Sequence, residues 1–416
     1  MKDQIAQIHI ACKQHIGQPA TPIVRDGDRV KKGQLIASCQ GFGANVHSSI
    51  DGTVTTVSEA GVSIKPDAIQ PLEYVKIKET NDHLEAIKEA GIVGAGGAGF
   101  PAYVKFETDL QGGCVIVNGA ECEPTLLHNI QVLEEEPENI IRGLKYIMEM
   151  TNAAKGTIAI KPKHKVALIN LAKAIKNIET EETKETKETK ETKETIGRIE
   201  IKYLPDNYPA GDERVVVREV LGVELEVGQL PLAVGAIVTN VETVKRVREA
   251  IDLRKPVITK DITVGGRLKD TLGMRGKVFL EQPIGMPASY YIAQCGGYVL
   301  PVGEIVLGGP FTGIKDEEDS WLTKTTGGIF AAMPFPVAEY QFGILACECG
   351  ATIERMRDMV AQMGGTVVSE TLCKRMVEHG GRFRCEKPGE CPGQTETALQ
   401  LFRQGAEAII TSACEN

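Results

Sequence analysis

The chain has 416 residues, 42% hydrophobic and 25% charged, which is the composition of a globular protein with several domains. A net charge of -9 and an isoelectric point near 5.5 argue against nucleic acid and anionic membrane surfaces as main partners. No apolar run reaches membrane-spanning length and the N-terminus lacks the apolar core of a signal peptide, so we expect a cytoplasmic protein without a membrane span of its own.

Residues 1–77 contain short runs with strand alternation, separated by turn signals such as Asp51-Gly52. This segment resembles the barrel-sandwich hybrid fold of biotinyl and lipoyl domains. Those domains carry a modifiable lysine at a hairpin tip, whereas the tip here reads Ser-Ser-Ile-Asp-Gly over 48–52. We therefore expect a structural β domain and no swinging arm.

In residues 78–255, strand-like runs alternate with amphipathic helical runs, which predicts an α/β domain with a largely parallel sheet. The range 179–196 interrupts this pattern with a three-residue repeat of Glu, Thr and Lys that contains almost no apolar residue. Such a segment cannot bury a face, so we interpret it as a low-complexity insert, either a solvated loop or a frayed helix extension.

The remainder of the chain predicts two smaller units joined by a linker. Residues 256–312 are β-rich around one helix and resemble the SLBB β-grasp module, while 313–340 reads as a linker. Residues 341–416 alternate strands and helices again, which predicts a small C-terminal α/β domain. Of the eleven cysteines, six lie in this last range. In a cytosolic protein, cysteines indicate thiols, metal sites or redox chemistry more than a disulfide scaffold.

A glycine-rich loop marks the first candidate site. Several glycines in a row are useful where a turn is very tight or where backbone must approach a ligand closely. A helical run precedes the loop, which counts against a Rossmann fingerprint, because that motif follows a strand. Backbone N–H groups and a lysine suit a phosphate, and aromatic rings suit a flat ligand, although a buried turn with core aromatics is the alternative. The residues concerned are Gly94, Gly96, Gly97, Gly99, Phe100, Lys105 and Phe106.

Polar residues follow three further element boundaries. Ligands of open parallel sheets sit at the carboxyl ends of the strands, and amide and carboxylate groups there can bind ring N–H groups, ribose hydroxyls or a carboxamide. The residues are Asn118, Glu121 and Glu123 after a buried strand, Gly211, Asp212 and Glu213 before a helix, and Asn240 at another strand end.

The motifs "GAGGAGFPAYVK", "NGAECEP", "YPAGDE" and "TNVET" resemble, in this order, those of the NADH-binding flavoprotein subunit of respiratory complex I and of the related RnfC protein of the Rnf electron-transport complex. The resemblance covers roughly residues 1 to 340. It implies that the residues above surround FMN, with Phe100, Phe106 and Glu123 facing NADH, and that a hydride passes from NADH to the flavin. Ala120 replaces an aspartate of the complex I pattern, and Asp212 is one methylene shorter than the glutamate of that pattern.

The C-terminal cysteines depart from the Rnf pattern, which carries two ferredoxin-type runs. Cys347 and Cys349 follow a predicted strand just before a helix, where a helix N-terminus lowers a thiol pKa, so they could be redox thiols together with Cys391 and Cys414. Alternatively, three or four of these cysteines could bind an iron–sulfur cluster or a zinc ion, although their spacing matches no standard zinc pattern.

An Rnf-like chain with a cysteine-bearing tail is similar to the electron-transfer protein associated with D-proline reductase. This resemblance implies a reductase partner such as D-proline reductase, reached through FMN and the tail cysteines. Two alternatives stay open: the RnfC component of an Rnf complex, and a docking subunit that has lost its flavin. Self-association also stays open.

Overall fold

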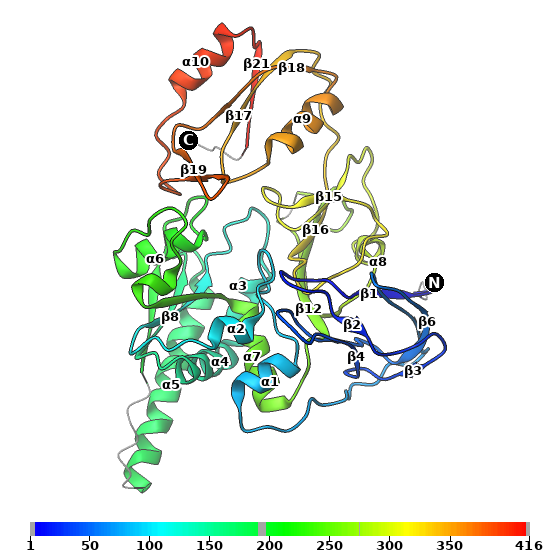
Figure 1. Cartoon of the computed structure of the whole chain (residues 1–416), viewed down its shortest axis with the longest axis vertical. Coiled ribbons are helices and arrows are strands. Elements are labelled where there is room, and N and C mark those ends of the chain that lie inside the picture. The colour runs from blue at the N-terminus through cyan, green and yellow to red at the C-terminus, as the bar shows by residue number, and fades with distance from the viewer. Residues whose placement is uncertain (1–4, 190–196, 274, 413–416) are drawn as a thin grey trace.

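The computed structural model describes residues 5–189, 197–273 and 275–412, which build four modules (Figure 1). The modules carry six sheets between them, and each sheet is formed within one module. None of the helices in these ranges combines the length and apolar character that a bilayer span requires.

The N-terminal β module, residues 5–77, consists of two small sheets with strand orders β1-β7-β6-β3 and β2-β4-β5. Alternate apolar side chains point into its core, as Ile8 and Ile10 do from β1. The hairpin tip is buried, because the Ser49 hydroxyl donates to the Ile284 carbonyl of another module at 2.6 Å. The strands are β1 Ile8–Ala11, β2 Thr21–Pro22, β3 Arg29–Val30, β4 Leu35–Ser38, β5 Val46–His47, β6 Gly52–Val57 and β7 Gly61–Pro66.

The α/β module, residues 78–255, has a four-stranded sheet in the order β10-β9-β8-β11, and every pair in it is parallel, as the sequence predicts. Helices cover both faces: Ile116 of β8 packs toward α6, while Val115 and Val117 pack toward α4 and α7. The elements are α1 His83–Glu89, α2 Ala102–Phe106, β8 Cys114–Gly119, α3 His128–Glu135, α4 Pro137–Met150, β9 Lys155–Ile160, α5 Lys165–Thr189, β10 Arg198–Tyr203, α6 Glu213–Leu221, the 3-10 turn η1 Pro231–Val234, β11 Ala236–Asn240 and α7 Val241–Leu253.

The helix α5 carries the beginning of the low-complexity repeat. It continues without interruption to Thr189, and Figure 1 shows its end projecting away from the sheet. A helical extension is one of the two interpretations that the sequence left open for this segment. Residues 190–196 of the repeat lie outside the described residues.

The β-rich module, residues 256–340, has a five-stranded sheet in the order β13-β12-β16-β14-β15, with α8 beside it. The range 313–340, expected to be a linker, is wrongly assigned, because β15 and β16 pair within this sheet. Their short runs lie between glycines and polar residues, and they become strands only through pairing with β12 and β14. The elements are β12 Thr259–Gly266, β13 Lys277–Pro283, α8 Ala288–Gln294, β14 Ile305–Leu307, β15 Ile314–Asp316 and β16 Gly328–Ala331.

A buried ion cluster joins α7 to this β-rich module. The Arg246 guanidinium lies 2.7 Å from Glu281, 2.8 Å from Glu249 and 3.0 Å from Glu242. Since a buried charge is costly unless paired, the Arg246–Glu281 contact fixes α7 firmly against β13. The start of α7, which carries Asn240 as its cap, is thereby held in place.

The C-terminal module begins at residue 341 and has a parallel sheet in the order β18-β17-β21, flanked by α9 and α10, plus a separate β19–β20 hairpin. Figure 1 shows the module at one end of the molecule, next to α6. The elements are β17 Gln341–Ala346, α9 Ile353–Gln362, β18 Thr366–Leu372, β19 Met376–His379, β20 Arg382–Cys385, α10 Thr395–Arg403 and β21 Ala408–Thr411.

Candidate functional site

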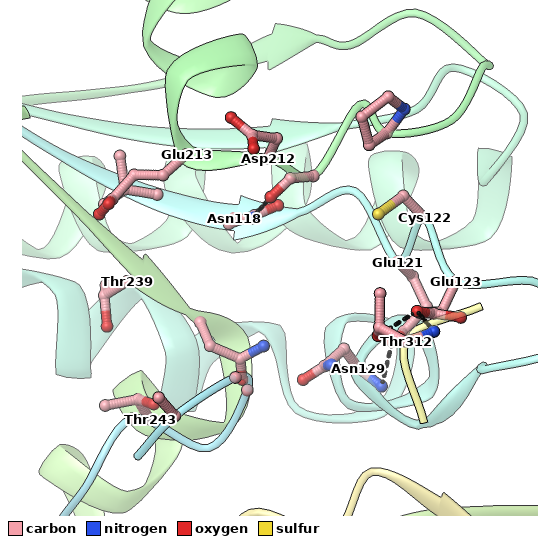
Figure 2. A pocket seen from close by; sticks show the side chains of 18 of the residues that line it. Asn118, Glu121, Cys122, Glu123, Asn129, Asp212, Glu213, Thr239, Thr243 and Thr312 are labelled. Carbon is pink, nitrogen blue, oxygen red and sulfur yellow. Dashed lines mark hydrogen bonds between the residues drawn. The ribbon is translucent and has the colours of Figure 1, made fainter. Parts of the chain in front are cut away.

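A cavity of about 590 Å³ opens at the carboxyl ends of β8 and β11. This volume is within the usual range of small-molecule sites, roughly 300–1,000 Å³. Figure 2 shows acidic side chains at the start of α6 and along the segment after β8, with Thr239 and Thr243 on another side. The structure brings together here all the predicted cofactor-binding residues except Phe106: Gly94, Gly96, Gly97, Gly99, Phe100, Lys105, Asn118, Glu121, Glu123, Gly211, Asp212, Glu213 and Asn240.

The glycine-rich loop folds back on itself along one wall of the cavity. The Gly94 amide donates to the Phe100 carbonyl at 2.9 Å, and the Ala95 amide donates to the Thr243 hydroxyl at 2.9 Å. Gly97 has φ of +71°, and a Cβ built there would meet no atom within 4 Å. Bare backbone at Gly97 therefore faces open space inside the site, where a flat or phosphorylated ligand can approach it.

The prediction that Phe106 stacks on a ligand is wrong. Phe106 is 0% exposed and lies in the hydrophobic core, whereas Phe100 is 39% exposed and lines the cavity. Ala102 and Phe106 are four residues apart in α2 and are its buried residues, whereas the Lys105 side chain is partly exposed and lines the cavity. Phe100 instead meets the ring of Phe42 edge to face, with centroids 5.4 Å apart.

Polar groups at the ends of strands and helices shape the floor of the cavity. The Asn118 amide group donates to the Gly211 carbonyl at 2.9 Å, which ties the end of β8 to the segment before α6. Asp212 caps α6 by accepting from the Arg214 amide, and Asn240 caps α7 by accepting from the Glu242 amide. Both helix N-termini thus face the cavity, and their partial positive charge favours an anionic group.

The acidic residues of the cavity have protein donors. Glu213 pairs with the Lys105 ammonium at 3.3 Å, and Glu121 accepts from the Asn129 amide at 2.9 Å, at the start of α3. Burial raises the pKa of the Asp212 carboxyl. Because these carboxylates are satisfied by the protein, the glycine loop and the helix N-termini stay available to an anionic ligand.

Glu123 joins the cavity to the β-rich module. Its carboxylate accepts from the amides of Phe311 and Thr312, both at 2.9 Å, and from the Thr312 hydroxyl (Figure 2). The loop between β14 and β15 is therefore held at the mouth of the cavity. Glu123 lines the site as expected, but its oxygens bind this loop.

Sequence reasoning missed several lining residues. Cys122 lies between two predicted glutamates, which was the available signal, and burial raises its pKa to about 11. Tyr208 directly precedes the segment that carries Asp212, and its hydroxyl donates to the Cys349 carbonyl. Its ring contacts Phe311 edge to face at 4.7 Å. Other lining residues that were not predicted include Asn129, Thr239, Thr243, Thr312, Glu348 and Pro388.

The structure separates the predicted cysteines. Cys349 lines the cavity, while Cys347 lies next to it outside the lining and Cys391 is exposed elsewhere. The expected lowering of the thiol pKa is wrong for Cys349, because a hydrogen bond with Cys347, together with burial, raises it. Cys349 does not lie in the first turn of the helix, which begins only at Ile353 with Thr352 as its cap. Cys414 lies outside the described residues.

No group of three or more His, Cys, Asp or Glu side chains in the described ranges is arranged to hold a metal ion. These residues therefore supply no ligand set for the iron–sulfur or zinc alternative. The chemistry that they do gather is a wall of bare backbone, Lys105 and two helix N-termini, opposite amides and carboxylates. That donor set fits a phosphorylated, hydrogen-bonding ring such as FMN.

Two known families match the chain. Residues 3–79 match the RnfC barrel sandwich hybrid domain, and residues 87–249 match the Nuo51 FMN-binding domain. The second range contains all the predicted cofactor-binding residues.

Several characterised proteins are similar over long stretches. The RnfC-type component of the Na+-translocating ferredoxin:NAD+ oxidoreductase complex of Acetobacterium woodii is 31% identical over 335 residues, which is 76% of this chain and 70% of that protein. Its counterpart in the proton-translocating complex of Clostridium ljungdahlii is 31% identical over 344 residues, 78% of this chain and 70% of that one. The cobalamin reductase PduS of Salmonella typhimurium is 34% identical over 246 residues, 59% and 48% of the two chains.

Among solved structures, the fold is similar to that of a chain in an NAD+-reducing NiFe-hydrogenase in its H2-reduced state. The TM-score is 0.50 at 18% identity, over 60% of this chain and 46% of that chain. At this identity the likeness concerns the fold alone.

Proposed function

The chain belongs to the RnfC family, and from this premise we propose that it is an electron-transfer subunit that binds FMN in the 590 Å³ cavity and takes electrons from NADH. When bound, FMN accepts a hydride from NADH and releases the electrons to a second carrier. The observation that carries this proposal is the meeting of four separate motifs around bare backbone at Gly97, beside Lys105.

The chemistry of the cavity residues suits them to different parts of the proposed ligands. The backbone of the glycine loop, Lys105 and the helix N-termini suit the phosphate. Asn118, Glu121 and Asn240 suit the hydrogen-bonding edges of the ring and its side chain, while Phe100 and Glu123 stand on the side proposed for NADH. The β14–β15 loop, held by Glu123, helps to keep water out of the cavity.

We further propose that Cys347 and Cys349 are the next carrier. NADH supplies two electrons and one proton, solvent supplies a second proton, and a Cys347–Cys349 disulfide becomes two thiols. The hydrogen bond between these two groups and the place of Cys349 on the cavity wall support this assignment. Cys391 and Cys414 stay predictions as later carriers, and a D-proline reductase-type enzyme stays the proposed acceptor.

A second candidate is the RnfC component of an Rnf-type complex, favoured by the 31% identity with two such proteins over three quarters of this chain. It differs from the first in the acceptor, because the ferredoxin-type cysteine runs of the Rnf pattern are missing from this sequence. An anaerobic iron determination separates the two: iron bound to the purified chain favours the Rnf-type assignment.

The proposed function is tested with the full chain, reconstituted with FMN under anaerobic conditions. We expect flavin absorbance bands that NADH bleaches, and weaker retention of FMN by Lys105→Ala than by Lys88→Ala, which removes a lysine outside the cavity lining. A featureless spectrum after reconstitution would contradict the proposal and favour the flavin-free docking subunit. Bands that NADH leaves unchanged would remove NADH as the donor.

A further inference from the structure

Glu348, the residue between the two cysteines, accepts three hydrogen bonds through its carboxylate. One carboxylate oxygen accepts from the Arg214 guanidinium at 3.1 Å and from the Cys385 amide at 2.6 Å. The other accepts from the Arg384 guanidinium at 2.5 Å. The Glu348 side chain is only 20% exposed, and it lines the cavity. The oxygen that accepts from Arg214 thus joins the α/β module to the C-terminal module, while the bonds from Arg384 and the Cys385 amide fix the carboxylate within its own module.

Arg214 is the other half of this contact. It lies in the first turn of α6, is 14% exposed, and also donates to the Cys385 carbonyl at 2.6 Å. On its other side it lies 3.7 Å from Asp212, which lines the cavity. A guanidinium carries several donors in a fixed plane. Arg214 can therefore bind the Glu348 carboxylate and the Cys385 carbonyl of the C-terminal module while it also faces Asp212 of the α/β module. Arg214 therefore connects the cavity wall with the segment that carries Cys347 and Cys349.

Other contacts between these modules are weaker or more exposed. Arg218 donates to the Pro388 carbonyl at 3.1 Å, and Lys387 pairs with Glu224 at 3.0 Å on the rim. Exposed ion pairs such as Lys387–Glu224 contribute little to the stability of an interface. The Tyr208 hydroxyl bonds to the Cys349 carbonyl and orients the backbone, but it carries no charge to select the docked position. The Arg214–Glu348 pair differs from these contacts because it joins two charged side chains that are both mostly buried, 14% and 20% exposed.

We propose that Glu348 is a positioning residue: paired with Arg214, it latches the C-terminal module onto α6 and so keeps Cys349 at the wall of the cavity. Its consequence for electron transfer rests on the proposed function above. With the latch closed, the cysteine pair faces the site where the electrons arrive. With the latch broken, the module loses its fixed position on α6 and Cys349 becomes accessible to reagents in solvent.

The direct test measures how fast N-ethylmaleimide modifies Cys349 in the full chain without flavin, read by peptide mass spectrometry. We expect Glu348→Gln to raise the rate about tenfold, which corresponds to ~1.4 kcal/mol. Arg214→Gln should raise it similarly, and the double variant should add little, because both changes break one contact. Glu354→Gln, an exposed glutamate in the first turn of α9, is the matched control and should label as the wild type does.

Arg214→Gln makes the test decisive. If Glu348 acted only through its charge on the thiol, removing it would speed labelling, but removing the positive Arg214 would slow it. Faster labelling in both variants therefore supports the latch, and slower or unchanged labelling in Arg214→Gln overturns it. Glu348→Asp, which keeps the charge, should restore part of the wild-type protection; no rescue would also count against the latch.

A second measurement connects the latch to electron flow. In stopped-flow and quenched-flow experiments with FMN and NADH on the oxidised chain, the latch predicts that reduction of the Cys347–Cys349 disulfide, read as thiols after an acid quench, falls at least about tenfold more than flavin bleaching in Arg214→Gln. Equal losses in both steps would overturn the positioning role. If NADH fails to bleach the wild-type protein, the proposed function fails, while the labelling experiment still decides whether the latch exists.

Discussion

Replacing Glu123 by glutamine tests how the cavity is closed. The Glu123 carboxylate accepts from two backbone amides and one hydroxyl of the β14–β15 loop, at residues Phe311 and Thr312. A glutamine keeps the size of the side chain but offers only one acceptor oxygen, and its NH2 group would face donors. Glu123→Gln should therefore loosen this loop while the rest of the fold stays intact.

The expected size of this effect follows from the hydrogen bonds that the Glu123 carboxylate would lose. Hydrogen bonds to a charged group contribute roughly 1.5–3 kcal/mol, and the amide oxygen can retain one of them in weaker form. A loss of about 1.5 kcal/mol in holding the loop corresponds to roughly tenfold faster exchange of the Phe311 and Thr312 amides. NADH-driven bleaching of bound flavin should slow as well, because Glu123 stands on the side proposed for NADH.

Hydrogen exchange followed by mass spectrometry on a peptide spanning 309–313 measures the first effect. Glu317→Gln serves as the control, since Glu317 is exposed at the end of β15. Exchange in Glu123→Gln that matches the wild type would refute the reasoning that this carboxylate holds the loop. Unchanged bleaching kinetics would separately remove Glu123 from the proposed NADH side.

Three further predictions concern the cavity, the thiols and the core. Gly97→Ala should weaken FMN binding about tenfold, because its methyl group enters the cavity. Gly380→Ala is the control, because Gly380 also has a positive φ, +60°, but lies outside the cavity lining. This variant should bind FMN as the wild type does, and flavin titration measures both. The Cys347→Ser, Cys349→Ser double variant should still be bleached by NADH yet fail to reduce an aromatic disulfide. Burial lowers the pKa of Lys324 to about 7 from its ordinary 10.5, so the unfolded state binds more protons between these values. The unfolding free energy should therefore rise from about pH 7 to 10, by at most ~1.4 kcal/mol per unit, and Lys324→Met should flatten this rise in urea titrations.

The cavity could be predicted from sequence because its parts lie at element boundaries. Asn118 and Asn240 end neighbouring parallel strands, and Asp212 begins a helix beside them. Carboxyl ends of parallel strands meet at one edge of a sheet, so residues far apart in the chain converge without any knowledge of side-chain packing. The four motifs therefore predict residues that line one cavity in the structure.

Prediction from the sequence failed where the structure depends on the orientation of a helix or on a contact between residues far apart in the chain. A helix as short as α2 does not reveal from its residues which side faces the core, and Phe106 was placed on the wrong one. Glu348 pairs with a residue 134 positions away, and Tyr208 bonds to one 141 positions away. No local pattern encodes such contacts, so the docking of the C-terminal module and the raised pKa of Cys349 were both missed.

The buried hairpin tip of the N-terminal β module sets a limit on what that module can become. In carrier domains the corresponding tip must travel between distant catalytic centres with a tethered group. Here Ser49 is anchored to the Ile284 carbonyl, with almost no surface open to solvent. Introducing a lysine at this point would not create a carrier, because no modifying enzyme could reach it. The module therefore has a structural role, in which its hairpin tip packs against the β-rich module.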